Sequence, residues 1–343
     1  MRLIRVLSFT NKGTELALHI MDKLPGSVFE TKAYSERTED FLRESFEMAV
    51  PVVIVGACGI AVRLIAPFVR DKLSDSAVIV CDETGRFVIP ILSGHVGGAN
   101  RLAREIADIT GGEAVITTAT DVNGLFAADC FAMYNGLYIE NRDGVKEVSA
   151  VLLKRGYITM SIGDGIDYDE ANAPSEVKLV SYPPVEEADV IVSERKEDRS
   201  RCRLLLIPRR YTVGMGCRSG VSKDIIDTRL KTGLGMAGVK SVNKEVSCIA
   251  SIDLKAAEHG LLKCAAENGI KLVTFSDKEL LEVEGNFTES EFVREITGVS
   301  NVCERACICA AGEGAELVLK KQAGDGVTVA VARRKVRIER WKE

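Results

Sequence analysis

The sequence predicts an α/β protein built from open, mostly parallel sheets covered by helices. Short apolar runs of strand length alternate with amphipathic helical patterns near both ends of the chain. The run at 51–55 is continuously apolar, which is typical of a strand buried on both faces of a sheet. Such strands need helices on both sides. The 343 residues are enough for two or three domains.

The first predicted domain covers residues 1–131. Within its second helix, Phe41, Leu42 and Phe46 recur at helical spacing, and the other helices follow the same rule. The expected strands are 2–9, 27–31, 51–55, 77–81, 87–92 and 114–117. The expected helices are 12–24, 38–49, 60–68 and 102–109.

A looser, turn-rich pattern predicts a small middle domain at 132–203. Its expected elements are a helix at 145–155 and strands at 157–162, 177–181 and 190–192. The run at 194–203 mixes both signs of charge and is typical of a solvated loop.

The α/β rhythm resumes in a third predicted domain, residues 204–343. Its expected strands are 204–207, 211–215, 247–252, 271–275, 317–320 and 327–333, and its helices are 221–230 and 254–268. Two capping boxes, one at Ser276 with Glu279 and one at Thr288 with Glu291, predict further short helices. An Asp-Gly turn at 325–326 predicts the terminal hairpin.

Composition excludes several classes of protein. The 45 basic and 50 acidic side chains give a net charge of −5, and there is one tryptophan, which argues against a nucleic-acid binder. No apolar run is long enough to span a bilayer, and the N-terminus has no signal-peptide pattern, so we expect a cytoplasmic protein.

The ten cysteines include no CxxC pair. The closest group, at 303, 307 and 309, favours helix packing over a metal site.

Three apolar strands run into glycine-rich turns that open helices, at 56–59, 93–98 and 214–220. Such a turn lies at the carboxyl end of a strand and presents free N–H groups at the positive end of a helix, which favours anions. Neither the Walker nor the Rossmann spacing occurs. The alternative is that these glycines only permit tight turns and close packing. The candidate binding residues are Gly56, Gly59, Arg63, Ser93, Gly94, Gly97, Gly98, Asn100, Arg101, Gly214, Gly216, Cys217, Arg218 and Ser219.

His95 is the candidate general acid or base, because it lies between two glycine pairs at the expected mouth of the sheet. The alternative is a histidine that caps the helix start. A polar segment follows the next strand and contributes further hydrogen-bonding candidates, or else an N-cap or Asx turn. These candidates are Thr117, Thr118, Thr120 and Asp121.

Two cysteines in these turns, Cys58 and Cys217, are candidate nucleophiles, since a helix dipole can lower the pKa of a thiol. Neither has a histidine nearby in the sequence, and whether either acts as a nucleophile stays open.

The segments 56–63, 92–100, 117–121, 214–220 and 252–256 together resemble the CbiG family, the cobalt-precorrin-5A hydrolases of anaerobic cobalamin biosynthesis. The Ser-Gly-His-Val-Gly-Gly-Ala-Asn segment at 93–100 is the most specific part. The resemblance covers nearly the whole chain. It implies an N-terminal domain, a variable middle and a C-terminal domain similar to CobE.

The resemblance implies hydrolysis of a δ-lactone between the ring A acetate and a meso carbon, which then leaves with its methyl as acetaldehyde. Cobalt travels in the substrate, so no cofactor or metal of the protein's own is expected. From the residues, we expect His95 as base, oriented by Asp121. The expected oxyanion donors are the N–H groups of Gly97 and Gly98 and the hydroxyls of Thr117, Thr118 and Thr120. The three turn arginines, Arg63, Arg101 and Arg218, are expected to hold substrate carboxylates in a cleft between two lobes.

Two other functions stay open. One is a non-catalytic carrier that holds a corrinoid intermediate for the methyltransferases of the pathway, which the similarity to CobE favours. The other is an α/β enzyme acting on a small phosphorylated metabolite. Transient contact with the methyltransferases is compatible with either corrinoid function, and a homodimer is one option for the oligomeric state. Neither nucleic acid nor a membrane is an expected partner.

Overall fold

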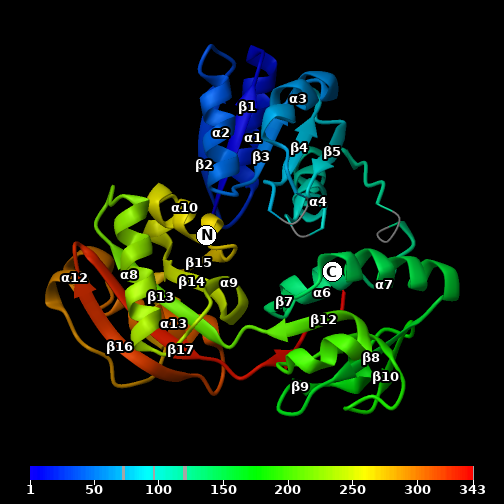
Figure 1. The fold of residues 1–343 in the computed structure, drawn as a ribbon. Helices are drawn as coiled ribbons and strands as arrows, with labels where there is room; N and C mark the ends of the chain where they lie inside the picture. Colours follow the sequence, from blue (N-terminus) through cyan, green and yellow to red (C-terminus); the bar gives the residue numbers. More distant parts are fainter. Residues whose placement is uncertain (72–73, 96, 119–121, 343) are drawn as a thin grey trace.

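A computed structural model describes residues 1–71, 74–95, 97–118 and 122–342. It contains three α/β domains, with the N-terminal domain placed above the other two (Figure 1). The expected α/β class is confirmed, because each domain pairs one main sheet with helices. None of the described helices is long and apolar enough to cross a membrane.

The N-terminal domain has a sheet of order β2-β1-β3-β4-β5-β6. Its strands are β1 (Arg2–Ser8), β2 (Ser27–Ala33), β3 (Val52–Val55), β4 (Val78–Cys81), β5 (Phe87–Leu92) and β6 (Glu113–Ala114). Its helices are α1 (Asn11–Lys23), α2 (Thr38–Glu47), α3 (Cys58–Ile65), the 3-10 helix η1 (Ala66–Phe68) and α4 (Ala99–Thr110). Ile20 and Leu102 bury one face of the sheet, and Leu42 and Ile65 bury the other. The sheet is mostly parallel, as expected, and β5 is the exception, because it runs antiparallel to β4.

The middle domain has a sheet of order β10-β8-β11-β12-β7. Its elements are α6 (Ala128–Tyr134), β7 (Leu137–Ile139), α7 (Arg142–Arg155), β8 (Ile158–Ile162), β9 (Asp167–Tyr168), η2 (Glu170–Asn172), β10 (Val177–Val180), β11 (Ala188–Val192), η3 (Lys196–Arg201) and β12 (Cys202–Pro208). Part of the run expected to be a solvated loop forms η3, in which Asp198 is buried and accepts a hydrogen bond from Tyr182 at 2.8 Å.

The core of the middle domain reaches beyond the expected boundaries of 132 and 203. Phe126 and Phe131 enter it from the N-terminal side, and Trp341 enters it from the chain end. Strand β12 pairs with β11 and β7, so it belongs to this sheet and not to the third domain. A last short strand, β18 (Arg337–Ile338), pairs with β9. Pairing and burial between distant segments therefore decide these boundaries.

The C-terminal domain has a sheet of order β15-β14-β13-β17-β16. Its elements are β13 (Tyr211–Cys217), α8 (Lys223–Met236), α9 (Val242–Glu245), β14 (Val246–Ile252), η4 (Asp253–Lys255), α10 (His259–Glu267), β15 (Lys271–Phe275), α11 (Asp277–Glu282), α12 (Glu291–Thr297), α13 (Val302–Ala311), β16 (Glu316–Gly324) and β17 (Val327–Arg333). The capping box at Ser276 is confirmed. The one at Thr288 is wrong, because Thr288 bonds Glu304 through its N–H at 2.8 Å and its hydroxyl at 3.0 Å.

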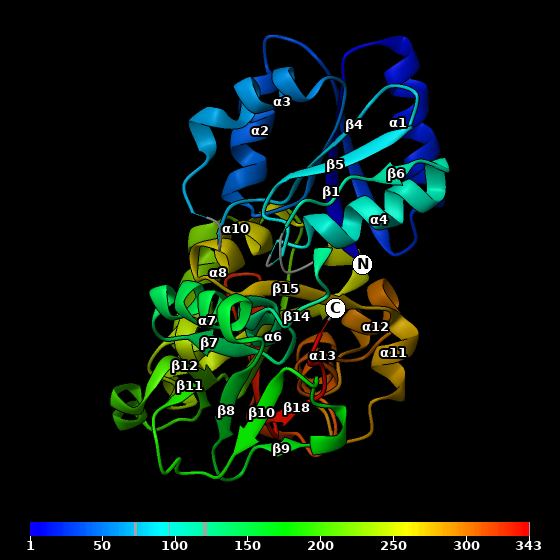
Figure 2. The ribbon, with the colours of Figure 1, turned by 90° about the vertical axis from the view of Figure 1, so that its right-hand side faces the viewer.

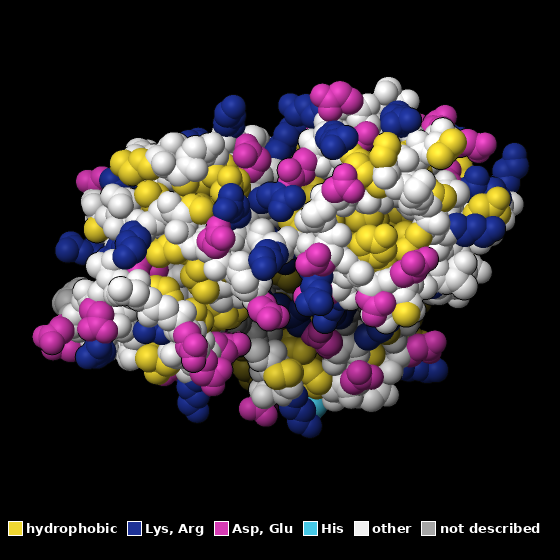
Figure 3. All heavy atoms as spheres, turned by 90° about the horizontal axis from the view of Figure 1, so that it is seen from below, with side chains coloured by type: hydrophobic (Ala, Val, Ile, Leu, Met, Phe, Trp, Pro, Cys, Tyr) yellow, Lys and Arg dark blue, Asp and Glu magenta, His cyan; other side chains and the backbone are white. Residues whose placement is uncertain are grey.

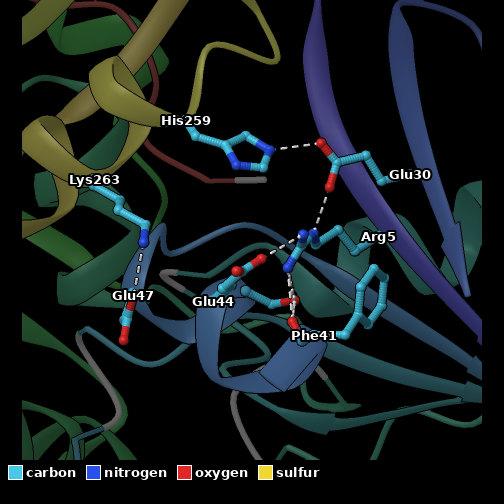
Figure 4. Close-up of polar contacts among 8 residues, drawn as sticks. Arg5, Glu30, Phe41, Glu44, Glu47, His259 and Lys263 are labelled. Carbon is cyan, nitrogen blue, oxygen red and sulfur yellow. Dashed lines mark hydrogen bonds and ion pairs between the residues drawn. The ribbon is translucent and has the colours of Figure 1, made fainter. Parts of the chain in front are cut away.

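The N-terminal domain is fixed to the C-terminal domain through α10 and β15 (Figure 2). The N-terminal ammonium of Met1 donates to Asp253 at 2.6 Å and to Thr274 at 2.8 Å. Figure 4 shows a second polar contact, in which His259 bonds Glu30 at 2.7 Å and Glu30 accepts from Arg5 at 2.7 Å. These contacts hold β1 and β2 against the C-terminal domain.

Candidate active site

A cavity of about 480 Å³ lies where the three domains meet. Leu3, Pro51 and Ala77 line it from the amino ends of β1, β3 and β4. Residues of α6 and β7 line it from the middle domain, and Ser247 and Leu272 from the starts of β14 and β15. Its volume falls within the range of small-molecule sites, and its position between domains is typical of them.

The turn after β5 reaches this cavity because β5 is antiparallel to its neighbour β4. Its carboxyl end therefore lies at the same edge of the sheet as the amino ends of β1, β3 and β4. Gly97, in this turn, lines the cavity. A side chain at this position would collide with its own turn, since a Cβ on Gly97 would lie 2.5 Å from Cβ of Ser93.

His95 and Asp129 meet beside the cavity. His95 Nδ1 lies 3.8 Å from Asp129 Oδ1, and only 17% and 8% of the two side chains are exposed. Asp129 belongs to the first turn of α6 and also lines the cavity. A carboxylate at this distance can orient an imidazole and stabilise its protonated form, as a positioned general base requires. No local sequence pattern marks Asp129, because the contact joins two domains.

The remaining residues of the turn are held by hydrogen bonds to backbone carbonyls. The N–H of Gly98 donates to the carbonyl of His95 at 2.9 Å, so this N–H is engaged inside the turn and is not offered to an oxyanion. Asn100 is buried, and its N–H donates to the carbonyl of Gly94 at 2.9 Å. Ser93 has a φ of 54° and donates its hydroxyl to the carbonyl of Asp75 at 2.8 Å.

One of the expected polar partners reaches this turn. Asn100 Nδ2 lies 3.5 Å from the hydroxyl of Thr118, whereas Thr117 is exposed. Thr120 and Asp121 lie outside the described residues, so their expected roles stay predictions.

His95, Asp129 and Cys130 are also able to hold a metal ion. One ligand atom from each lies within 4.8 Å of the others. Nitrogen, oxygen and sulfur ligands of this kind suit zinc, and three of them leave a position for water. By contrast, Cys303 and Cys307 pack inside the C-terminal core, and burial raises the pKa of the Cys303 thiol to about 11, which supports helix packing there.

The turn at 56–59 lies at the opposite edge of the N-terminal sheet from the cavity. It follows β3, whose amino end faces the cavity, so the turn leaves at the far end. A Cβ on Gly56 would lie 2.7 Å from the ring of Phe9, so this glycine permits close packing. Gly59 and Arg63 belong to α3, which starts from this turn, and neither lines the cavity.

The turn at 214–220 also lies outside the cavity lining. A Cβ on Gly214 would come within 1.7 Å of the Cys303 carbonyl, and one on Gly216 within 2.9 Å of the Thr328 hydroxyl. Both glycines lie in β13, where Gly214 lets α13 pack against the strand. Burial raises the pKa of Cys217 to about 11, more than nearby Lys255 lowers it, so the expected activation of this thiol is not supported.

The three turn arginines do not meet in one cleft. Arg218 is exposed at the end of β13, and Ser219 beside it is exposed as well. Arg101 lies on a separate surface depression, 3.6 Å from Glu105. The expected cleft lined by all three is therefore wrong, because the turns leave their sheets at edges that point in different directions.

Comparisons with known proteins identify the family. Models of the cobalamin synthesis G N-terminal region and C-terminus match residues 40–121 and 211–332. A cobalt-precorrin-5A hydrolase of Salmonella typhimurium is 32% identical, over 96% of this chain and 97% of that protein. This chain belongs to the cobalamin synthesis G family.

Other members of the cobalamin synthesis G family and a shorter relative are similar too. A cobalt-precorrin-5A hydrolase of Priestia megaterium is 31% identical, over 95% of this chain and 94% of that protein. The solved structure of CobE, from the cobalamin (vitamin B12) biosynthetic pathway, is 31% identical and covers 37% of this chain and 92% of its own, with a TM-score of 0.35. Asp129 lies between the two matched regions.

Proposed function

We propose that this protein hydrolyses cobalt-precorrin-5A. The observation that carries the proposal is the similarity to two proteins of that name at 31% and 32% identity over nearly the full length of each chain. The alignments extend through all three domains, and all three domains line the cavity.

The chemistry of a δ-lactone suits the groups beside the cavity. His95 takes a proton from water as its oxygen attacks the lactone carbonyl, and Asp129 stabilises the imidazolium that forms. Collapse of the tetrahedral intermediate breaks the ring C–O bond and leaves a hydroxyl on the two-carbon fragment. Loss of that hydroxyl proton and cleavage of the bond to the macrocycle release acetaldehyde, and the macrocycle takes up the electron pair.

The turn that carries His95 supplies the candidate groups for the oxyanion. Gly97 lies on the cavity wall, and its N–H together with the Thr118 hydroxyl are the donors we assign. Each such donor contributes on the order of 3 kcal/mol to stabilising a transition state of this kind.

The proposal includes no cofactor, since cobalt enters with the substrate. All ten cysteines are free thiols, which supports a reducing compartment such as the cytoplasm. Contact with methyltransferases of the pathway and assembly into a homodimer are further expectations that fit this function.

The direct test is anaerobic incubation with cobalt-precorrin-5A and trapping of acetaldehyde. We expect wild-type protein to release one acetaldehyde per substrate, and His95→Ala to lose release by at least about a hundredfold while still binding substrate. His19→Ala is the matched control, because His19 is an exposed histidine on α1 outside the cavity. Prior dialysis against a chelator is expected to leave the rate unchanged.

Three outcomes would contradict parts of this proposal. Stoichiometric binding without acetaldehyde would favour the carrier function, which the likeness to CobE keeps in view. Full activity of His95→Ala would remove His95 as the base. Loss of activity after chelation, restored by zinc, would make His95, Asp129 and Cys130 metal ligands instead.

A further inference from the structure

Three arginines line the cavity, and they differ in their partners. Arg2 forms an ion pair with Glu105, and Arg142 forms one with Asp71. Arg209 has no carboxylate within 4.0 Å among the described residues. Two of the three guanidinium groups are therefore already neutralised, and the third carries an uncompensated charge at the cavity wall.

Backbone carbonyls hold the guanidinium of Arg209 in place. Its Nε donates to the carbonyl of Asn243 at 2.9 Å, and its Nη2 donates to that of Gly269 at 3.3 Å. Its Nη1 makes no hydrogen bond to any described residue. A guanidinium held this way can offer its remaining N–H donors to a ligand with little loss of side-chain entropy.

Arg334 approaches the same wall from the C-terminal segment. Its Nη2 donates to the carbonyl of Asn135 at 3.1 Å, and a Cβ on Gly136 would lie only 2.3 Å from its Nη1. Gly136 lines the cavity, and its carbonyl accepts from the N–H of Arg209 at 3.0 Å. The Asn135–Gly136 turn thus joins the two arginines. Arg334 also lacks a carboxylate within 4.0 Å in the described part of the chain.

Lys271, at the start of β15, adds a third cation. It lines the cavity, and no described carboxylate lies within 4.0 Å of its ammonium. The charges of all three cations act on one buried thiol, that of Cys248. Burial raises the pKa of Cys248, and the charges of Lys271, Arg334 and Arg209 each act to lower it.

The two arginines lose solvation without a compensating ion pair. Burial lowers the pKa of Arg209, and it lowers that of Arg334, where the charge of Arg210 acts in the same direction. A more distant carboxylate, Glu339, partly opposes the shift at Arg334. Removing an unpaired charged group from water costs free energy. An anionic ligand in the cavity would offset this cost by pairing with the guanidinium groups.

We propose that Arg209, Arg334 and Lys271 form a carboxylate-binding subsite of the cavity. This inference rests on the proposed function, and it assigns the subsite to an acetate or propionate side chain of the macrocycle outside the lactone. The planar fork of Arg209 matches a carboxylate. Binding one carboxylate here would orient the macrocycle with its reacting edge toward His95, which lies beside another part of the cavity wall.

The test measures binding and turnover separately. Binding of cobalt-precorrin-5A is titrated anaerobically in a His95→Ala background, and uroporphyrin, a non-reactive macrocycle bearing acetate and propionate groups, serves as a second probe. We expect Arg209→Gln to weaken the binding of both probes by about tenfold to a hundredfold, since a charge-assisted hydrogen bond contributes about 1.5–3 kcal/mol. Adding Arg334→Gln should weaken binding further, and Arg209→Lys should be intermediate. In turnover assays we expect a raised KM with kcat changed less.

The controls separate this inference from the proposed function. Arg43→Gln removes an exposed arginine on α2 that does not line the cavity, and it should change neither binding nor KM. Thermal melting checks that each variant is folded. Unchanged affinity for both probes in folded Arg209→Gln and in the double variant would overturn the subsite even if wild-type protein releases acetaldehyde. Weakened uroporphyrin binding would support the subsite even if no acetaldehyde were released.

Discussion

At the scale of single residues, His95 was identifiable from the sequence and its partner was not. A histidine between glycine pairs after an apolar strand is a local pattern. Asp129 lies 34 positions further along and meets His95 only because α6 packs against the turn after β5. The expected partner, Asp121, falls outside the described residues, so its role stays a prediction.

We predict that Asp129 positions His95 and stabilises its protonated form. Asp129→Asn should lower kcat for acetaldehyde release by at least about tenfold. It should also shift the acidic limb of the pH–rate profile to lower pH, because a neutral amide no longer favours the imidazolium. The pH profile is the deciding measurement, since a purely structural defect would lower the rate without moving that limb.

Asp143→Asn is the matched control for this prediction. Asp143 occupies the first turn of α7, as Asp129 occupies that of α6, but its side chain is 89% exposed. Its replacement should leave both the rate and the profile unchanged. An unshifted limb in Asp129→Asn would show that Asp129 does not act on the protonation of His95.

At the scale of elements, most strands and helices follow from hydrophobic periodicity. The expected strand at 2–9 is β1, and the expected helix at 12–24 is α1. The hairpin of β16 and β17 turns at Asp325 and Gly326, both with positive φ, as the Asp-Gly signal predicts. The exceptions are elements that form because they pair with segments far away in the sequence. The short strand β7 has no alternating pattern and exists because it pairs with β12.

Alanine substitutions at Gly214, in strand β13, and at Gly235, in helix α8, should differ in their effect on the stability of the fold. Gly214→Ala should destabilise the fold by about 1–3 kcal/mol, because its Cβ would lie 1.7 Å from a backbone carbonyl of α13. Gly235→Ala, in α8 with no atom within 4 Å of the added Cβ, should be neutral or stabilise by up to about 1 kcal/mol. Urea denaturation of both variants measures the free energies of unfolding.

Equal stabilities of the two glycine variants would contradict the packing role assigned to the turn at 214–220. Gly214 would then be free for the ligand role that the sequence suggested. A large loss of stability in Gly214→Ala but not in Gly235→Ala would confirm that the close approach of α13 to β13 requires the glycine.

At the scale of the whole molecule, the domains are joined by charged contacts that the composition does not reveal. The net charge of −5 is spread as mixed signs, and basic and acidic side chains intermingle on the face shown in Figure 3. Meanwhile Arg209 and Lys271 gather at one cavity wall. Local charge at an interface therefore differs from the charge of the chain.

We predict that Glu30 stabilises the contact between the N- and C-terminal domains above about pH 4.5. Burial alone would raise the pKa of Glu30, but hydrogen bonds from His259 and Arg5 outweigh it and lower the pKa below its ordinary value of 4.5. A lowered pKa in the folded state means that this stabilisation is present above 4.5 and is lost as the pH falls through the folded value. Glu30→Gln should lower the free energy of unfolding by about 1 kcal/mol at pH 7.

Thermal melting of wild-type protein and Glu30→Gln across pH 7 to pH 3 checks this prediction. The difference in Tm should narrow as the pH falls, because protonated Glu30 and glutamine are both neutral. Glu47→Gln is the control. Glu47 pairs with Lys263 across the same interface, but its side chain is 49% exposed. Glu47→Gln should therefore lower the free energy of unfolding by about 0.5 kcal/mol or less. A constant difference down to pH 3 would show that titration of Glu30 is not responsible.

The sequence by itself determined the α/β class, most element positions and the family, and it singled out His95 as a candidate. These follow from periodicity and motif, which involve residues close together in the chain. Only the tertiary structure decided that β5 reverses, that the three glycine turns point to different edges, and that Asp129 and Arg209 reach the cavity, with Arg334 beside Gly136 in its wall. Strand order and direction are set by contacts between segments far apart in the chain, and a ligand site is assembled from those contacts.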